Sequence, residues 1–280
     1  MLILGQFFGV PGQVDQTTFL IVGSLAAILM GAAKSGFGGS VGMLATPLMI
    51  LACGHDAAMA TGILLPILIA CDYASMVYWW RQWEIRNIRL LVPGMVFGIG
   101  VGWIVLYYMF HGGADTVGRE RADNWLNLSV GLVAVGFALL HVIRWLRKDT
   151  RVYKPGVFGG LAAGSSAGFV STLAHTAGPI TNMYLLPQGM GKATFQATTV
   201  LYYWIGNQVK LVPYWNLNLL SSPVLKADLL FVPALLIGVV LGIFLHNRIN
   251  ERAFSTVVYV LLGAIGPYLI ATAGYRLWTM

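Results

Sequence analysis

The residues with the clearest chemical potential lie in a glycine-rich stretch at positions 34–42, with Pro47 five residues beyond it. This stretch interrupts two apolar runs. In hydrocarbon such a break is tolerated only where its unpaired backbone groups line a protein-walled or watery cavity. The candidate substrate-binding residues of this first break are Lys34, Ser35, Gly36, Gly38, Gly39 and Ser40. The sequence therefore predicts a binding site here.

A second break occupies the corresponding place in the second half of the chain. Its candidate binding residues are His175, Thr176, Gly178 and Asn182. If helices restart after residues 40 and 177, their free N–H groups and positive dipole ends face the two breaks. Lys34 supplies a countercharge, because an ionisable residue inside a membrane is a functional candidate by default. His175 supplies a hydrogen-bond donor or a proton carrier, so the pattern favours an anionic ligand.

Less specific interpretations stay open for the same side chains. Lys34 can instead snorkel to the membrane interface. His175 can be a neutral, hydrogen-bonded structural residue. The other polar side chains can cap helices or join them through hydrogen bonds; these are Ser35, Ser40, Thr176 and Asn182.

Two further charges, Asp72 and Lys210, fall inside apolar segments. They occupy nearly equivalent places in the two halves, so they can form an ion pair, or Asp72 can couple transport to protons. Alternatively, the two charges are separately solvated. Three amides share the segment of Lys210 and join the candidates for coupling or gating: Gln196, Asn207 and Gln208.

Composition places these residues in an integral membrane protein. Of 280 residues, 58% are hydrophobic and 10% charged, with a mean hydropathy of +0.75, whereas about a quarter of a soluble domain is charged. The net charge of +7 is attributed to basic cytoplasmic loops rather than to a nucleic-acid surface. The sequence contains no HExxH and no carboxylate pair at catalytic spacing. We therefore expect no enzyme, no catalytic residues, no metal site and no cofactor.

Apolar helices must position the site. We expect them at 17–34, 41–53, 57–80, 88–110, 124–146, 156–173, 178–188, 193–213, 227–247 and 253–278. Because a spanning helix needs about 20 residues, 41–53 and 178–188 are short. Each is expected to be part of a broken helix or of a re-entrant hairpin.

Basic residues orient these segments. Three connections rich in arginine or lysine, at 81–89, 144–154 and 248–252, are expected to face the cytoplasm by the positive-inside rule. The charge-balanced loop at 111–124 and both termini then lie outside. We expect a multi-pass protein of the inner, cytoplasmic membrane.

The same order of landmarks occurs twice in the chain. The matches are Gly36-Phe37 with Gly168-Phe169, Pro47 with Pro179, Ala60-Thr61 with Ala197-Thr198, and Leu90–Pro93 with Leu230–Pro233. Each half holds an odd number of crossings, so the halves must be inverted relative to one another. We predict an all-α polytopic membrane protein with two inverted-topology repeats of about five apolar helical segments each, 1–143 and 156–280. A basic cytoplasmic linker at 144–155 joins them, and broken or re-entrant helices lie at the centre, as in secondary transporters.

These residues resemble a known family. The runs GAAKSGFGG (31–39), ATPL (45–48) and AMATG (58–62) are similar to the first signature of the sulfite exporter TauE/SafE family, also called TSUP. A degenerate copy follows through Gly164, Gly168, Pro179, Ala197 and Thr198, so the resemblance covers nearly the whole chain. It implies an anion permease for sulfite or related sulfur anions such as organosulfonates, commonly acting in export. The chain departs from the usual three glycines with Ser40-Val41-Gly42, and with Leu173-Ala174-His175 in the second half, which leaves the substrate open.

The sequence thus predicts a secondary transporter of small anions that works by alternating access. The alternatives are an anion channel and a membrane-embedded receptor, and an intramembrane enzyme is the least favoured class. The expected partners are a small anionic substrate and the lipid bilayer, without nucleic acid. A homo-oligomer is compatible with the sequence, which does not report the direction of transport or a coupling ion.

Overall fold

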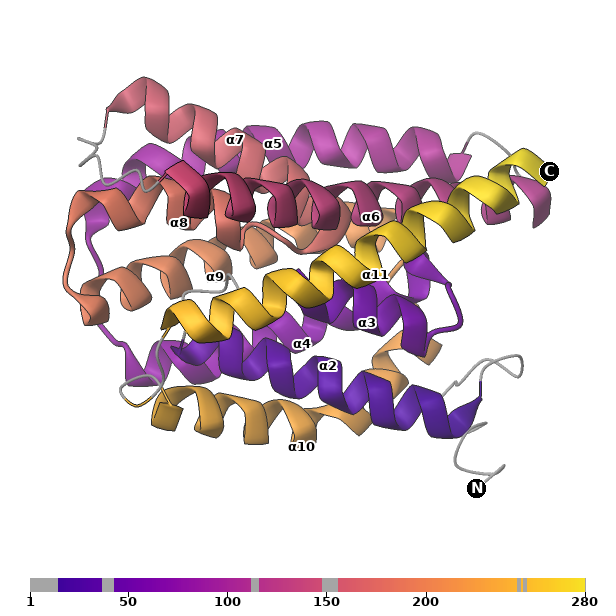
Figure 1. Cartoon of the computed structure of the whole chain (residues 1–280), viewed down its shortest axis with the longest axis horizontal. Coiled ribbons are helices and arrows are strands. Elements are labelled where there is room, and N and C mark those ends of the chain that lie inside the picture. Colours follow the sequence, from indigo (N-terminus) through magenta and orange to yellow (C-terminus); the bar gives the residue numbers. More distant parts are fainter. Residues whose placement is uncertain are drawn as a thin grey trace.

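The computed structural model of the chain is a bundle of helices packed side by side (Figure 1). It describes residues 15–36, 43–111, 116–147, 156–245, 248 and 251–279. In chain order the helices are α2 (Gln16–Gly36), α3 (Ala45–Ala52), α4 (Ala57–Tyr78), α5 (Ile85–His111), α6 (Thr116–Arg147), α7 (Val157–Ala174), α8 (Gly178–Leu185), the 3₁₀ turn η2 (Leu186–Gln188), α9 (Lys192–Asn216), α10 (Ser222–Leu245) and α11 (Glu251–Thr279). No strand occurs among the described residues, which confirms the predicted all-α class.

Six helical stretches in the described part of the chain are long and apolar enough to cross a membrane. They are Gln16–Gly36, Ala57–Tyr78, Ile85–Phe110, Glu120–Leu139, Val157–Ala174 and Ser222–Leu245. A window of about 20 apolar residues spans the hydrocarbon layer. The chain is therefore a multi-pass membrane protein.

Each expected apolar segment coincides with a helix, but some ends differ. Helix α6 begins at Thr116 and continues to Arg147, beyond both ends of the expected 124–146 and into the expected linker. Its added first turns contain Arg119, Glu120 and Arg121, because a helix can extend past the apolar part that hydropathy detects. Residues 148–155 of the expected linker lie outside the described residues.

Helices from the first half of the chain pack mainly against helices from the second half. Helix α2 packs on α10 and α5 packs on α7, while α4 lies against α9 and α6 against α11. The close pairs approach at glycines: a Cβ on Gly98 would collide with the carbonyl oxygen of Ser165, and one on Gly238 with that of Ile28. Small residues at these two positions therefore allow close helix packing.

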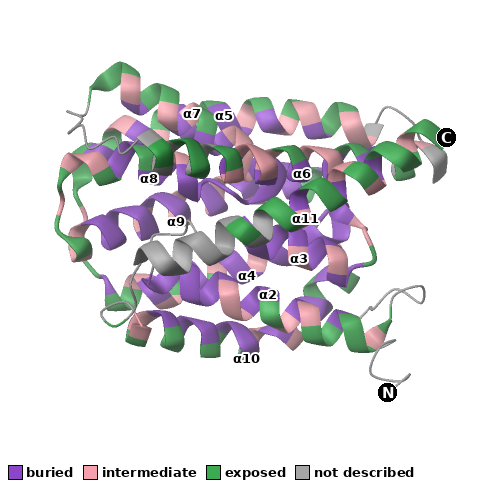
Figure 2. Cartoon of the chain, viewed as in Figure 1, coloured by how far each residue is buried: buried purple, intermediate pink, exposed green. Residues whose placement is uncertain are grey.

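The interior of the bundle is formed by α4 and α9, which are mostly buried in Figure 2, whereas α5, α10 and α11 carry exposed outer faces. Large apolar side chains on those faces include Phe97 and Ile104 of α5 and Val240 of α10. In a membrane protein these faces meet lipid. Helix α2 begins and α11 ends at the same end of the bundle, opposite the turn between α4 and α5 (Figure 1).

Candidate functional site

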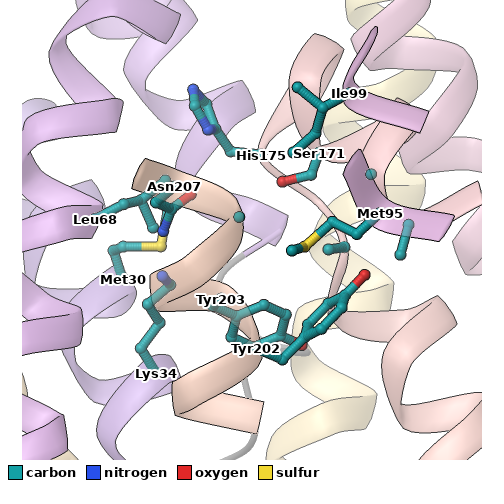
Figure 3. A pocket seen from close by; sticks show the side chains of 15 residues that line it. Met30, Lys34, Leu68, Met95, Ile99, Ser171, His175, Tyr202, Tyr203 and Asn207 are labelled. Atoms are coloured by element: carbon teal, nitrogen blue, oxygen red, sulfur yellow. The ribbon is translucent and has the colours of Figure 1, made fainter. Parts of the chain in front are cut away.

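A small cavity lies at the centre of the bundle, between α2, α4, α5, α7 and α9 and the start of α8. Its lining residues are Met30, Lys34, Leu68, Met95, Ile99, Ala167, Gly168, Ser171, His175, Ala177, Gly178, Tyr202, Tyr203, Gly206 and Asn207. Its volume of about 30 Å³ exceeds the roughly 10–15 Å³ needed to hold one water molecule. In Figure 3, Lys34 and Asn207 lie on one side and Ser171 and Met95 on the other. The cavity can hold a solute of only a few atoms in this conformation.

A buried ion pair forms one wall. Lys34 Nζ lies 2.5 Å from Asp72 Oδ1, and the Asn207 amide donates to Asp72 Oδ2 at 2.6 Å. The ammonium also lies 5.2 Å from the centre of the Tyr203 ring, within the range of a cation–π interaction. Lys34 is 6% exposed, so it does not snorkel to the surface. Of the arrangements that the sequence left open for Asp72, an ion pair with Lys210 is not formed, because α2 brings Lys34 to the carboxylate instead.

A second network surrounds Lys210, one turn further along the same face of α9. Its Nζ donates to the carbonyl oxygen and the hydroxyl of Ser171 at 3.3 and 3.1 Å, and lies 3.0 Å from His175 Nδ1. His175 Nε2 lies 3.0 Å from the carbonyl oxygen of Thr61. The Tyr214 hydroxyl lies 3.2 Å from the same nitrogen. These contacts join α4, α7 and α9.

The end of α7 is unusual at the backbone. His175 is its C-cap residue and has a φ of 52°, a left-handed conformation normally left to glycine. A non-glycine residue held there costs of order 1 kcal/mol and persists where the surroundings over-determine it. The hydrogen bonds of both ring nitrogens of His175 provide that constraint. The left-handed backbone at His175 ends α7 and turns the chain, and α8 begins at Gly178.

The start of α8 faces the cavity. Ala177 and Gly178 line it, and the helix has no side chain capping its N-terminus. The restart expected after residue 177 is confirmed. The free N–H groups and the helix dipole therefore favour negative charge at this point.

Helix α3 meets the end of α7 across the bundle. The Thr46 hydroxyl, in the first turn of α3, donates to the carbonyl oxygen of Ala174 at 2.7 Å. Helix α3 itself begins at Ala45 after a 3₁₀ turn at Met43 and Leu44. The restart expected after residue 40 falls on residues 37–42, which lie outside the described residues. Because Pro47 pre-sets the φ of a first helical turn, the helix starts close to it.

The end of α2 is closed by side chains from other helices. The Gln196 amide donates to the carbonyl oxygen of Lys34, and the Trp79 indole donates to that of Ser35 at 3.0 Å. These bonds satisfy carbonyl groups that the end of a helix leaves unpaired. Gln196 thus acts on the backbone of Lys34 rather than on the cavity.

The structure distributes the remaining sequence candidates as follows. Ser35 and Gly36 lie at the contact with α10, where the Ser35 hydroxyl donates to carbonyl oxygens of Gly31 and Val239. Thr176 and Asn182 are buried, and the side-chain oxygen of each has no hydrogen-bond partner among the described residues. Gln208 is partly buried and does not line the cavity. Gly38, Gly39 and Ser40 lie outside the described residues.

The sequence analysis missed several lining residues, notably Ser171, Tyr202 and Tyr203. A signal for the α9 wall is present in the sequence, because polar or aromatic side chains recur at helical spacing along that segment: Tyr203, Asn207, Lys210 and Tyr214. Residues three and four apart share one face of a helix. No group of three or more His, Cys, Asp or Glu that could hold a metal occurs within the described part of the chain.

Comparison with known proteins gives one finding. The family model described as "Sulfite exporter TauE/SafE" matches residues 23–269, which confirms the resemblance seen in the sequence runs. The searches of curated proteins and of solved structures found no match.

Proposed function

The chain belongs to the sulfite exporter TauE/SafE family, and on that premise we propose that it is a secondary transporter of small sulfur oxyanions, such as sulfite or an organosulfonate. Alternating access across the cytoplasmic membrane is its proposed mechanism. The family is one of transporters, and the proposal assigns the chain no catalytic activity.

One observation carries the proposal: the central cavity unites a buried ammonium group with the uncapped start of a half-helix. Lys34 and Gly178 line the same cavity. Lysine and free backbone N–H groups both favour an anion, and broken helices near a midplane site are typical of secondary transporters. Thr176 and Asn182 add polar groups beside the break, and their side-chain oxygens have no hydrogen-bond partner within the described part of the chain.

The helix pairs between the two halves support a two-repeat mechanism. If residues 1–143 and 156–280 are inverted repeats joined by the linker 144–155, then α2–α10 and α5–α7 each join the first helix of one half to the fourth of the other. The central pair α4–α9 joins the third helices. Rocking of one such pair against the other would open the cavity to alternate sides. We propose that the end carrying the α4–α5 turn is cytoplasmic, and that both termini lie outside.

Counterflow in proteoliposomes tests this function. Vesicles loaded with unlabelled sulfite should accumulate radiolabelled sulfite transiently, and Lys34→Met should abolish the accumulation. The matched control is Lys192→Met, which removes an exposed lysine at the start of α9 and should leave counterflow unchanged. A channel would only equilibrate the label, and an absence of any anion flux would refute the proposal.

A further inference from the structure

The charges around the central cavity do not balance. Among the described residues near it, Lys34 and Asp72 form a pair whose charges cancel. Lys210 is 1% exposed, and its three partners are the carbonyl oxygen of Ser171, the hydroxyl of Ser171 and a ring nitrogen of His175. These partners match the three N–H bonds of an ammonium group. None of them is a carboxylate.

The hydrogen bonds of His175 fix its ring as neutral. A carbonyl oxygen only accepts, so the Nε2 atom facing Thr61 O at 3.0 Å must carry the hydrogen. The Tyr214 hydroxyl near the same atom is turned to donate to the carbonyl oxygen of Thr172 at 2.8 Å. An ammonium group only donates, so the Nδ1 atom 3.0 Å from Lys210 Nζ accepts, and the ring is neutral. With Lys210 as an ammonium ion, the cluster carries one positive charge in excess.

The excess charge adjoins the cavity. Ser171 and His175, which hold Lys210, both line it, as do Lys34 and Gly178. The other buried carboxylate of the described helices, Asp228, lies on α10 and is absent from the lining. A buried charge without a counterion is costly, so an occupant with one negative charge would complete the site.

We propose that the site selects monovalent oxyanions, such as hydrogen sulfite or an alkylsulfonate, over divalent ones such as sulfate. In this assignment Lys210 determines specificity, because its positive charge balances the bound anion. The charge of Lys34 is already balanced by Asp72. A divalent anion would bring one negative charge that no group in the cluster balances. The inference rests on the proposed function and adds to it the charge of the substrate.

Methanesulfonate and sulfate are suitable probes, since they are similar in size and differ in charge. Calorimetry on the purified wild-type protein should show methanesulfonate binding at least about tenfold more tightly than sulfate, because uncompensated like charge is expensive in a desolvated site. Equal affinities, or tighter sulfate binding, would overturn the inference while leaving anion transport intact. Binding of neither probe nor sulfite would overturn the proposed function and the inference with it.

A pH series on the wild type needs no variant. Raising the pH converts hydrogen sulfite into divalent sulfite, whereas methanesulfonate stays monovalent. The apparent affinity for total sulfite should therefore weaken with rising pH relative to that for methanesulfonate. Sulfite binding that strengthens with pH, relative to the same control, would contradict the inference.

Charge variants give the sharper test. Lys210→Met should lose methanesulfonate binding, whereas Lys210→Arg should keep the preference and Lys192→Met should be neutral. Asp72→Asn raises the excess charge to two and should shift the preference toward sulfate. Adding Lys34→Met to Asp72→Asn restores one excess charge and should restore the preference for methanesulfonate. Preferences that do not follow this charge count would show that Lys210 and Asp72 have only structural roles.

Discussion

Lys34 and Asp72 should stabilise the protein as a coupled pair, because removing one partner leaves the other charge buried and unpaired. At the observed 2.5 Å separation, Coulomb's law gives an attraction of about 6–7 kcal/mol for an effective dielectric constant of about 20. The net loss in Lys34→Met is smaller, because Asp72 keeps its hydrogen bond from Asn207 and can take up a proton. We expect a fall of about 3–5 kcal/mol in the free energy of unfolding, typical of a buried charge left without its partner.

A double-mutant cycle measures this coupling. Asp72→Asn should cost a similar amount, since it leaves Lys34 uncompensated, whereas the double variant removes both charges of the pair. The double variant should therefore lose at least about 2 kcal/mol less than the sum of the two single losses.

Equilibrium unfolding in mixed detergent micelles gives the free energies, with Lys192→Met as a control for loss of an exposed lysine. Losses that add within about 0.5 kcal/mol would mean that the two residues act independently. The ion pair would then not be a structural unit of the site, and the charge count above would lose its basis.

Three further outcomes are expected. Cysteines placed at Arg86 and Asn218 should react with impermeant reagents from opposite sides of the membrane, and labelling from one side would exclude the proposed topology. Gly98→Ala should lower the free energy of unfolding by about 1–3 kcal/mol, because the added methyl group overpacks the α5–α7 contact. Gly100→Ala is the control: its Cβ would point into open space, so the free energy of unfolding should change by no more than about 0.5 kcal/mol. Burial lowers the pKa of His55, in the turn between α3 and α4, below its ordinary 6.5. The unfolded state then binds the proton more readily, so the free energy of unfolding should fall as the pH drops below about 6.5. In thermal unfolding at a series of pH values, His55→Gln should flatten this part of the stability profile.

Hydropathy and glycine spacing were sufficient to predict the helices and the second break. Each apolar segment reports a local property, because burial of a helix in hydrocarbon depends on its own composition. The restart at Gly178 was also predictable from local sequence, because Pro179 pre-sets the φ of a first helical turn. The helix ends were less predictable, as α6 shows, because its polar turns lie beyond the apolar run.

The partners of the charged side chains were decided only by the tertiary structure. Asp72 and Lys210 occupy nearly equivalent sequence positions, yet Asp72 contacts Lys34 and Asn207, and Lys210 contacts His175. Which face of each helix turns inward, and how far two helices slide past one another, depends on packing such as the glycine contacts between α2 and α10. The sequence by itself therefore predicted a charged, broken-helix site, and the packing of α2, α4, α7 and α9 determined that Lys210 has no carboxylate partner among the described residues.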